Sequence, residues 1–173
     1  YKRQGESFNA DSMKFNSNES YQTLLKERTV YGGGGIIPDH FVPLDTTGTS
    51  AYFNKLIRKG IFNQFALSWV NKNREYLEKK YPNFDKFNSK FDTQNAVDEL
   101  IEYAEAGGLE FKEDQYNKAK HVIHTRLKAN IAQDLFNYKK FYQIINDLNN
   151  ALEKSLELLK DDKAFSKLAM NNN

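Results

Sequence analysis

The feature that most constrains this chain is a run of four glycines between two short apolar segments. The stretch reads Arg28-Thr-Val-Tyr-Gly-Gly-Gly-Gly-Ile-Ile-Pro-Asp-His-Phe-Val-Pro43. Consecutive glycines lose much backbone entropy on ordering, so a folded chain keeps them where positive φ angles or a close backbone approach are needed. We therefore predict two short strands joined by a crowded turn. Pro38 fixes φ and lacks an amide donor, so the second strand is broken or lies at a sheet edge.

The residues on either side of this stretch predict the limits of the β-containing part. Residues 1–26 are polar and rich in Asn and Ser, which favours an extended arm before the first strand. Residues 45–50 form a predicted loop, in which Thr49 or Ser50 is expected to cap a helix. We place a domain boundary here, between residues 1–48 and 49–173.

Beyond this boundary the apolar residues recur every three or four positions, which is typical of helices. Gly60, Pro82 and the Gly107-Gly108 pair are predicted to end helices. The stripes predict helices over about 50–60, 61–81, 83–91, 92–107, 113–135 and 141–159. Each helix is amphipathic, so each buries one face against a neighbour. The predicted fold is mainly α: a bundle of five to six helices preceded by a short segment that contains a β-hairpin.

Composition excludes several functional classes. The net charge of +2 gives no electrostatic footprint for nucleic acid. The absence of cysteine excludes disulfides and cysteine-based metal or redox chemistry. No apolar run approaches the ~20 residues that cross a bilayer. We expect no cofactor.

Two histidines three residues apart are the main candidate metal ligands. His121 and His124 lie on a predicted helix, with Asp114 about two turns earlier as a weak third ligand. Zinc takes three or four protein ligands, and no clear third partner lies nearby. We expect ordinary surface or helix-packing histidines and no metal.

The local sequence disfavours two kinds of site, a Ser-His-Asp catalytic triad and a nucleotide-binding P-loop. Adjacent Asp39 and His40 cannot easily present the carboxylate to the same imidazole, so a triad with Ser12, Ser17 or Ser20 is unfavourable. A P-loop needs a lysine and a helix after its glycines, whereas Gly35 leads to Ile-Ile-Pro. Asp39 is expected to be a turn residue.

Apolar stripes also allow a binding interpretation. Aromatic residues recur on two predicted helices (Phe62, Phe65, Trp69, Phe141 and Tyr142), and they are expected to belong to the core rather than to a peptide groove. The spacing from Phe141 to Leu159 resembles a coiled-coil seam and has the better claim to a partner helix, although an intramolecular one suffices.

The glycine-rich stretch resembles a signature of carboxy-terminal processing (tail-specific) serine proteases, in the segment just after their catalytic core. The residues that carry the match are Gly32, Gly33, Gly34, Gly35, Ile36, Pro38 and Asp39, within Gly35-Ile36-Ile37-Pro38-Asp39 and the glycines before it. The flanks, from Tyr1 to Tyr52, resemble a bacterial branch with a long helical C-terminal extension. The resemblance is strongest over the first third of the chain.

The resemblance implies a peptidase with a serine nucleophile and a lysine base upstream of the motif, so we expect no catalytic residue in this chain. Tyr1 is expected to begin a fragment that lacks the protease core and the PDZ module. The implied partners are the upstream core of the same chain and the C-termini of substrate proteins, with a possible homo-oligomer. The implied location is the periplasm or cell envelope of a Gram-negative bacterium. The alternative is a non-catalytic helical module that binds a peptide or a partner helix.

Overall fold

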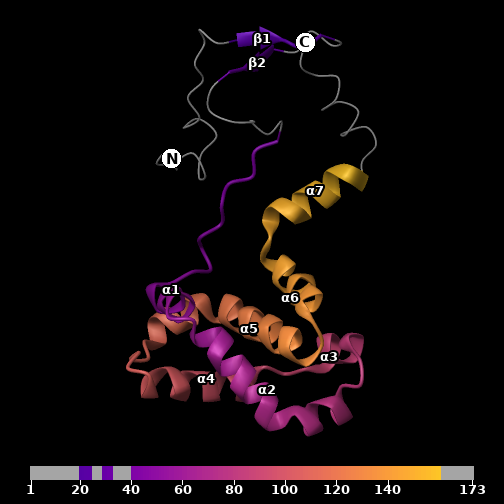
Figure 1. The fold of residues 1–173 in the computed structure, drawn as a ribbon. Helices are drawn as coiled ribbons and strands as arrows, with labels where there is room; N and C mark the ends of the chain where they lie inside the picture. Colours follow the sequence, from indigo (N-terminus) through magenta and orange to yellow (C-terminus); the bar gives the residue numbers. More distant parts are fainter. Residues whose placement is uncertain (1–19, 25–28, 33–39, 161–173) are drawn as a thin grey trace. The chain divides into compact units, whose positions relative to one another are not determined.

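The computed structural model describes residues 20–24, 29–32 and 40–160, and these residues are mainly helical (Figure 1). The chain divides into two compact units, residues 1–45 with 150–173, and residues 46–149. The predicted fold class is confirmed: helices dominate, and a two-stranded antiparallel hairpin precedes them. The division of the chain into residues 1–48 and 49–173 stays a prediction.

The first unit contains the hairpin. Strand β1 covers Ser20–Gln22 and pairs antiparallel with β2, Thr29–Tyr31, so that Tyr21 lies opposite Val30. The strand predicted before the glycines is therefore present. Its described partner, β1, lies within residues 1–26, so the prediction that this stretch is an extended arm before the first strand is wrong at Ser20–Gln22. Ser-Tyr-Gln lacks the apolar alternation that identifies a half-buried strand, and all three side chains are exposed.

The second unit consists of six helices and a short 3₁₀ turn. Their bounds are α1 Ala51–Arg58, α2 Ile61–Lys80, α3 Phe84–Lys90, α4 Gln94–Ala106, α5 Glu113–Leu135, α6 Tyr138–Ile145 and η3 Asn146–Leu148. A seventh helix, α7, covers Asn150–Lys160 and belongs to the first unit. No described helix is long and apolar enough to cross a membrane.

The start of α1, the break between α1 and α2, and the end of α4 lie where the sequence predicts them. The Ser50 hydroxyl accepts a hydrogen bond from the Phe53 amide at 3.2 Å and caps α1. Gly60 takes a left-handed φ of 68° and separates α1 from α2. Gly108, at φ 76°, ends α4 while the Leu109 amide bonds to the Ala104 carbonyl.

Helix α5 is the centre of the second unit and packs against α1, α2, α4 and α6. Figure 1 shows it crossing the middle of this unit. Every residue from Val122 to Phe136 is buried or half-buried, so this stretch meets neighbours on all sides. Its buried alanines, Ala129 and Ala132, allow close approach of the surrounding helices.

An aromatic cluster closes the end of the core near α3. Phe87 is fully buried, stacks on Phe91 at 4.5 Å between ring centroids, and meets Tyr81 and Phe136 edge-on. Edge-to-face and offset rings add to the stabilisation from area burial. Phe62, Phe65 and Phe141 are buried as well, which confirms a core role for these predicted aromatics; Trp69 is half-buried and Tyr142 is exposed.

The single long helix predicted over 141–159 is wrong. Helix α6 ends at Ile145, the 3₁₀ turn follows, and Asn149 takes a non-helical conformation (φ −104°, ψ 87°) before α7 begins. Three asparagines, Asn146, Asn149 and Asn150, supply the side chains that compete with helical hydrogen bonding. The apolar spacing continues through this break, which is why periodicity alone does not reveal it.

Candidate functional site

The glycine motif lies almost wholly outside the described residues. Gly32 is described, is half-buried and directly follows β2. The other motif residues, Gly33, Gly34, Gly35, Ile36, Pro38 and Asp39, lie outside, as do Ser12, Ser17 and the strand predicted after the glycines. Ser20 and His40, the described members of the triad that the sequence makes unfavourable, are both exposed.

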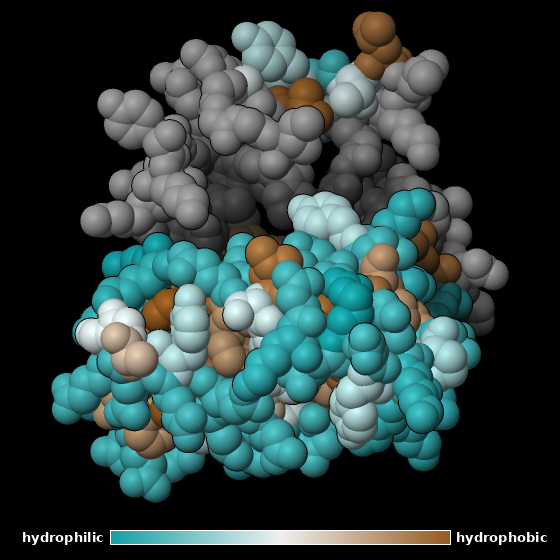
Figure 2. Space-filling model, turned by 60° about the horizontal axis from the view of Figure 1, so that its bottom comes forward, coloured by the Kyte–Doolittle hydropathy of each residue, from teal (hydrophilic) through white to brown (hydrophobic). Residues whose placement is uncertain are grey.

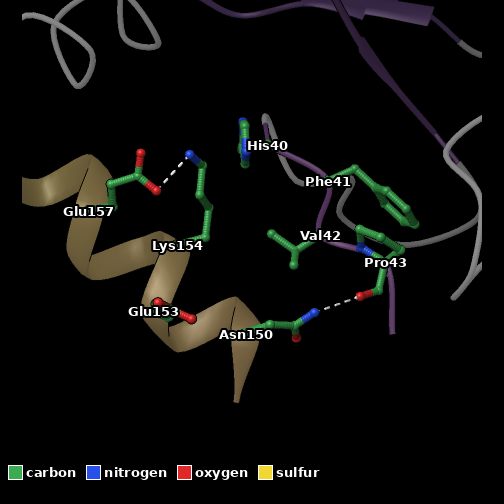
Figure 3. Close-up of a pocket in the computed structure, with 8 residues that line it drawn as sticks. All are labelled: His40, Phe41, Val42, Pro43, Asn150, Glu153, Lys154 and Glu157. Carbon is green, nitrogen blue, oxygen red and sulfur yellow. Dashed lines mark hydrogen bonds and ion pairs between the residues drawn. The ribbon is translucent and has the colours of Figure 1, made fainter. Parts of the chain in front are cut away.

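The first unit has a cavity of about 300 Å³ between the extended segment His40–Pro43 and helix α7 (Figure 3). The Asn150 amide donates to the Pro43 carbonyl at 3.0 Å and fixes the segment to the start of the helix. The Lys154 ammonium is bound to the Glu157 carboxylate at 2.7 Å. The lining also includes the imidazole of His40, which can act as a base, but it contains no serine, threonine or cysteine that could act as a nucleophile.

The second unit has a cavity of about 540 Å³ where the α1–α2 junction meets the end of α4. It is lined by Lys59, Ile61, Gln64, Tyr103, Ala106 and Gly107. The Tyr103 hydroxyl donates to the Gln64 side-chain oxygen at 3.5 Å. These groups can hold a polar molecule; the lining contains no carboxylate, imidazole or thiol, and its titratable side chains are Lys59 and Tyr103.

His124 sits in a hydrogen-bonded bridge between helices. Its Nδ1 lies 2.7 Å from the Thr93 hydroxyl, and its Nε2 lies 3.0 Å from the Tyr116 hydroxyl. Burial lowers the pKa of His124 below its ordinary value, with Lys120 as a second cause. His121 and Asp114 are exposed. Both ring nitrogens of His124 are occupied by hydroxyls, so the pair of histidines does not present two free ligands to one ion.

No group of three or more His, Cys, Asp or Glu side chains within 20–24, 29–32 and 40–160 is placed to hold a metal ion. The sequence reasoning identified His124 but not its partners. Tyr116 lies eight residues before His124, about two helical turns, so the sequence spacing could have indicated that the two side chains share a face of the helix. Thr93 lies at the start of a different helix, α4, and no spacing rule connects it to His124 on α5.

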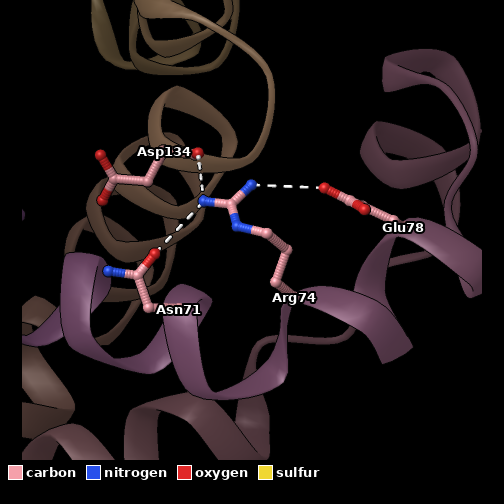
Figure 4. Close-up of polar contacts among 4 residues, drawn as sticks. All are labelled: Asn71, Arg74, Glu78 and Asp134. Atoms are coloured by element: carbon pink, nitrogen blue, oxygen red, sulfur yellow. Dashed lines mark hydrogen bonds and ion pairs between the residues drawn. The ribbon is translucent and has the colours of Figure 1, made fainter.

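Arg74 joins α2 to the C-terminal end of α5 (Figure 4). Its Nη2 donates to the Asp134 carbonyl at 3.3 Å and to the Asn71 side-chain oxygen at 3.4 Å, while Nη1 faces the Glu78 carboxylate at 3.4 Å. Figure 4 shows the Asp134 carboxylate pointing away from the guanidinium. A cation that satisfies a carbonyl in the last turn of a helix stabilises that end. Arg74 is therefore a structural brace.

Figure 2 shows a mainly hydrophilic face of the helical unit, with hydrophobic residues in small separate patches. Together with the buried core, these observations define a helical domain built around one central helix, with a described cavity of its own at the junction of α1 and α2.

Comparison with known families gives one match within this domain. Residues 52–137, just under half of the chain, match a family described as "Family of unknown function (DUF8443)". The matched stretch runs from α1 through α5 and stops at Asn137, the N-cap of α6. Searches of curated proteins and of solved structures found no match.

Proposed function

We propose that this chain is the C-terminal, non-catalytic part of a serine-type carboxy-terminal processing peptidase. Residues 1–48 end the protease core, and residues 49–173 form a helical region that braces it. The observation that carries the proposal is the run from Gly32 to Asp39, which resembles the family's signature directly after a β-strand. The helical region has its own core, as expected of an appended domain.

In the complete peptidase, the reacting groups are supplied upstream of Tyr1. A serine attacks the peptide bond, and a lysine serves as its base only when burial keeps the amine neutral. The substrates of such a peptidase are proteins with accessible C-termini, and its location is the periplasm or cell envelope. In this proposal the present chain supports the sheet edge near the glycines, because an uncovered edge invites pairing with another chain.

The deciding experiment uses the parent gene and its protein. We expect the sequence before Tyr1 to contain a Ser-Ala-Ser-like stretch and a Gly-Lys-Gly-like stretch. The purified parent should react with a serine-directed probe, and removal of everything after Gly48 should lower its melting temperature more than the reactivity of its soluble fraction. A parent without those stretches, or one that never labels, contradicts the proposal.

One observation favours the second candidate, a non-catalytic interaction module. Helix α7 has no buried residue, and Leu156 and Leu159 are 49% and 61% exposed. Leu152, Leu156 and Leu159 follow the three-four spacing of a helix-binding face. Replacing Leu156 and Leu159 with glutamate should abolish co-purification of a partner if this reading is right, and should leave probe reactivity of a parent peptidase unchanged if the first one is.

A further inference from the structure

Arg126 is a half-buried cation that no described acid neutralises. It lies on the central helix α5 with its guanidinium carbon 4.8 Å from the centre of the Phe141 ring. Its Nε is covered and has no hydrogen-bond partner. Among residues 40–160, no hydrogen bond or ion pair reaches the side chain of Arg126. Burial lowers its pKa, and only Tyr142 opposes that effect.

Two exposed tyrosines of α6 lie against Phe141, the ring that the Arg126 guanidinium covers. The Tyr138 and Tyr142 hydroxyls are 2.8 Å apart, and the two side chains are 61% and 46% exposed. Their rings meet edge-on at 5.1 Å, and both rings contact Phe141, on which Arg126 rests. One hydroxyl proton of the pair is used in the bond between them, so the other remains available to donate outward.

The contrast with Arg74 shows that this arrangement is unusual within the same domain. Arg74 satisfies a carbonyl, an amide oxygen and a carboxylate, whereas Arg126 is desolvated without any of these. Partial burial of an unpaired charge opposes folding, and a partly desolvated charge near exposed aromatic residues marks a candidate binding site. Arginine and tyrosine are also the residue types enriched at energetically important interface positions.

We propose that Arg126, Tyr138 and Tyr142 form a docking site for a carboxylate side chain of an acidic peptide segment in a protein partner. The carboxylate approaches the terminal nitrogens of the guanidinium, because Nε is covered. The free tyrosine proton gives a further hydrogen bond, and the ring faces cover the apolar atoms next to the carboxylate. The proposal is independent of the peptidase assignment, since it requires only this domain and its charge.

The chemistry of the site favours a carboxylate over a phosphate group. An arginine fork matches the two oxygens of a carboxylate in one plane, and one cation balances its single negative charge. Phosphate carries more charge, and the described site adds only one hydroxyl donor to that single cation. The exposed aromatic rings fit a peptide, which presents apolar atoms beside its acidic side chains.

The test follows the Arg126 Nε–H signal by nuclear magnetic resonance in the whole chain, with the signal assigned by its loss in Arg126→Lys. The probe is a blocked peptide of alternating glutamate and alanine, and its partner probe has glutamine in place of glutamate. We expect saturable shifts of the Arg126 signal and of the Tyr138 and Tyr142 ring signals with the glutamate peptide. The glutamine peptide should bind roughly tenfold more weakly or not at all.

Variants separate the site from general charge effects. Arg126→Met should lose binding of the glutamate peptide, and Arg126→Lys should weaken it, because lysine keeps the charge but lacks the fork. Arg58→Met is the matched control: it removes an exposed arginine from α1 and should leave binding unchanged. The melting temperature of Arg126→Met should be no lower than that of the unaltered chain. Replacing an unpaired, partly buried charge by an apolar side chain removes the free-energy cost of desolvating that charge.

Several results overturn the proposal. Shifts that do not saturate, equal binding of the glutamine peptide, or full binding by Arg126→Met each contradict it. Inorganic phosphate that binds more tightly than the glutamate peptide makes this a phosphate site instead. If Arg126→Met fails to fold, the arginine is structural, and the proposal then stands or falls on the shifts of the unaltered chain and of Arg126→Lys.

Discussion

The hydrogen-bonded bridge at His124 gives the sharpest test of how this domain is held together. Thr93→Val removes one hydroxyl while keeping the shape of a side chain that is only 9% exposed. Thr93 is the N-cap of α4, yet its side chain makes no capping hydrogen bond, so the variant costs no cap. The change leaves Nδ1 of His124 without its partner at 2.7 Å. Any loss of stability therefore reports on the bridge.

The expected loss follows from the cost of an unpaired, partly buried polar group, which is about 1–3 kcal/mol. A domain of roughly 100 residues shifts its melting temperature by about 4–8 °C per kcal/mol. Thr93→Val should therefore melt about 4–24 °C lower at neutral pH. Ser89→Ala is the control: its hydroxyl is exposed, so its effect should stay within about 0.5 kcal/mol. Equal stability of Thr93→Val and the unaltered chain refutes the reasoning.

The same bridge makes stability depend on pH in a definite direction. Burial depresses the pKa of His124 in the folded chain, so the unfolded chain binds the proton more readily. The stability that results is present above the ordinary histidine pKa of about 6.5 and is lost as pH falls below it. Denaturant unfolding at pH 7.5 and 5.5 should show a smaller pH effect in His124→Phe than in the unaltered chain. A histidine that titrates above 6.5 contradicts this sign.

Three further predictions concern the core and one helix end. Leu127→Ala empties a fully buried position in the central helix and should cost about 2–5 kcal/mol in denaturant unfolding, whereas exposed Leu67→Ala should cost little; similar effects of the two would mean that α5 is not the core. Gly108→Ala should lower the free energy of unfolding by about 1 kcal/mol, because Gly108 has a left-handed φ of 76°. Gly107→Ala should lower it less, and thermal melting of the two variants measures the difference. Tyr52→Phe should melt at the same temperature or higher, because the buried Tyr52 hydroxyl has no partner and burial raises its pKa to about 12; a lower melting temperature would indicate an unseen hydrogen bond.

The boundaries of α1, α2 and α4 were predictable because their signals are local, whereas the break between α6 and α7 was not. Ser50 and Gly60 act within three or four residues, and hydrogen-bond geometry at that range depends on the residue type itself. Strand β1 was not predictable: the polar triplet from Ser20 gains its extended form by pairing with residues seven or more positions away. Pairing of that kind leaves no mark on a short polar sequence.

The candidate sites were less predictable than the helices. Arg126 lies between a threonine and a leucine in a helical stripe, and its aromatic partner is on the next helix. The spacing of Tyr138 and Tyr142 by one helical turn was visible, but nothing in the sequence shows that Arg126 would lie on the Phe141 ring between them. The glycine motif presents the opposite case, since its signal comes from the sequence and most of its residues lie outside the described structure.

The burial of α5 on all sides has a consequence for the order in which the domain opens. A backbone amide in the stretch from Val122 to Phe136 meets water only when the helices packed around it separate. Such amides exchange their hydrogens through global unfolding, whereas the short α1 and α3 can open by smaller local fluctuations. Deuterium should therefore enter the second half of α5 last, and its slowest amides should report the free energy of unfolding of the whole helical unit.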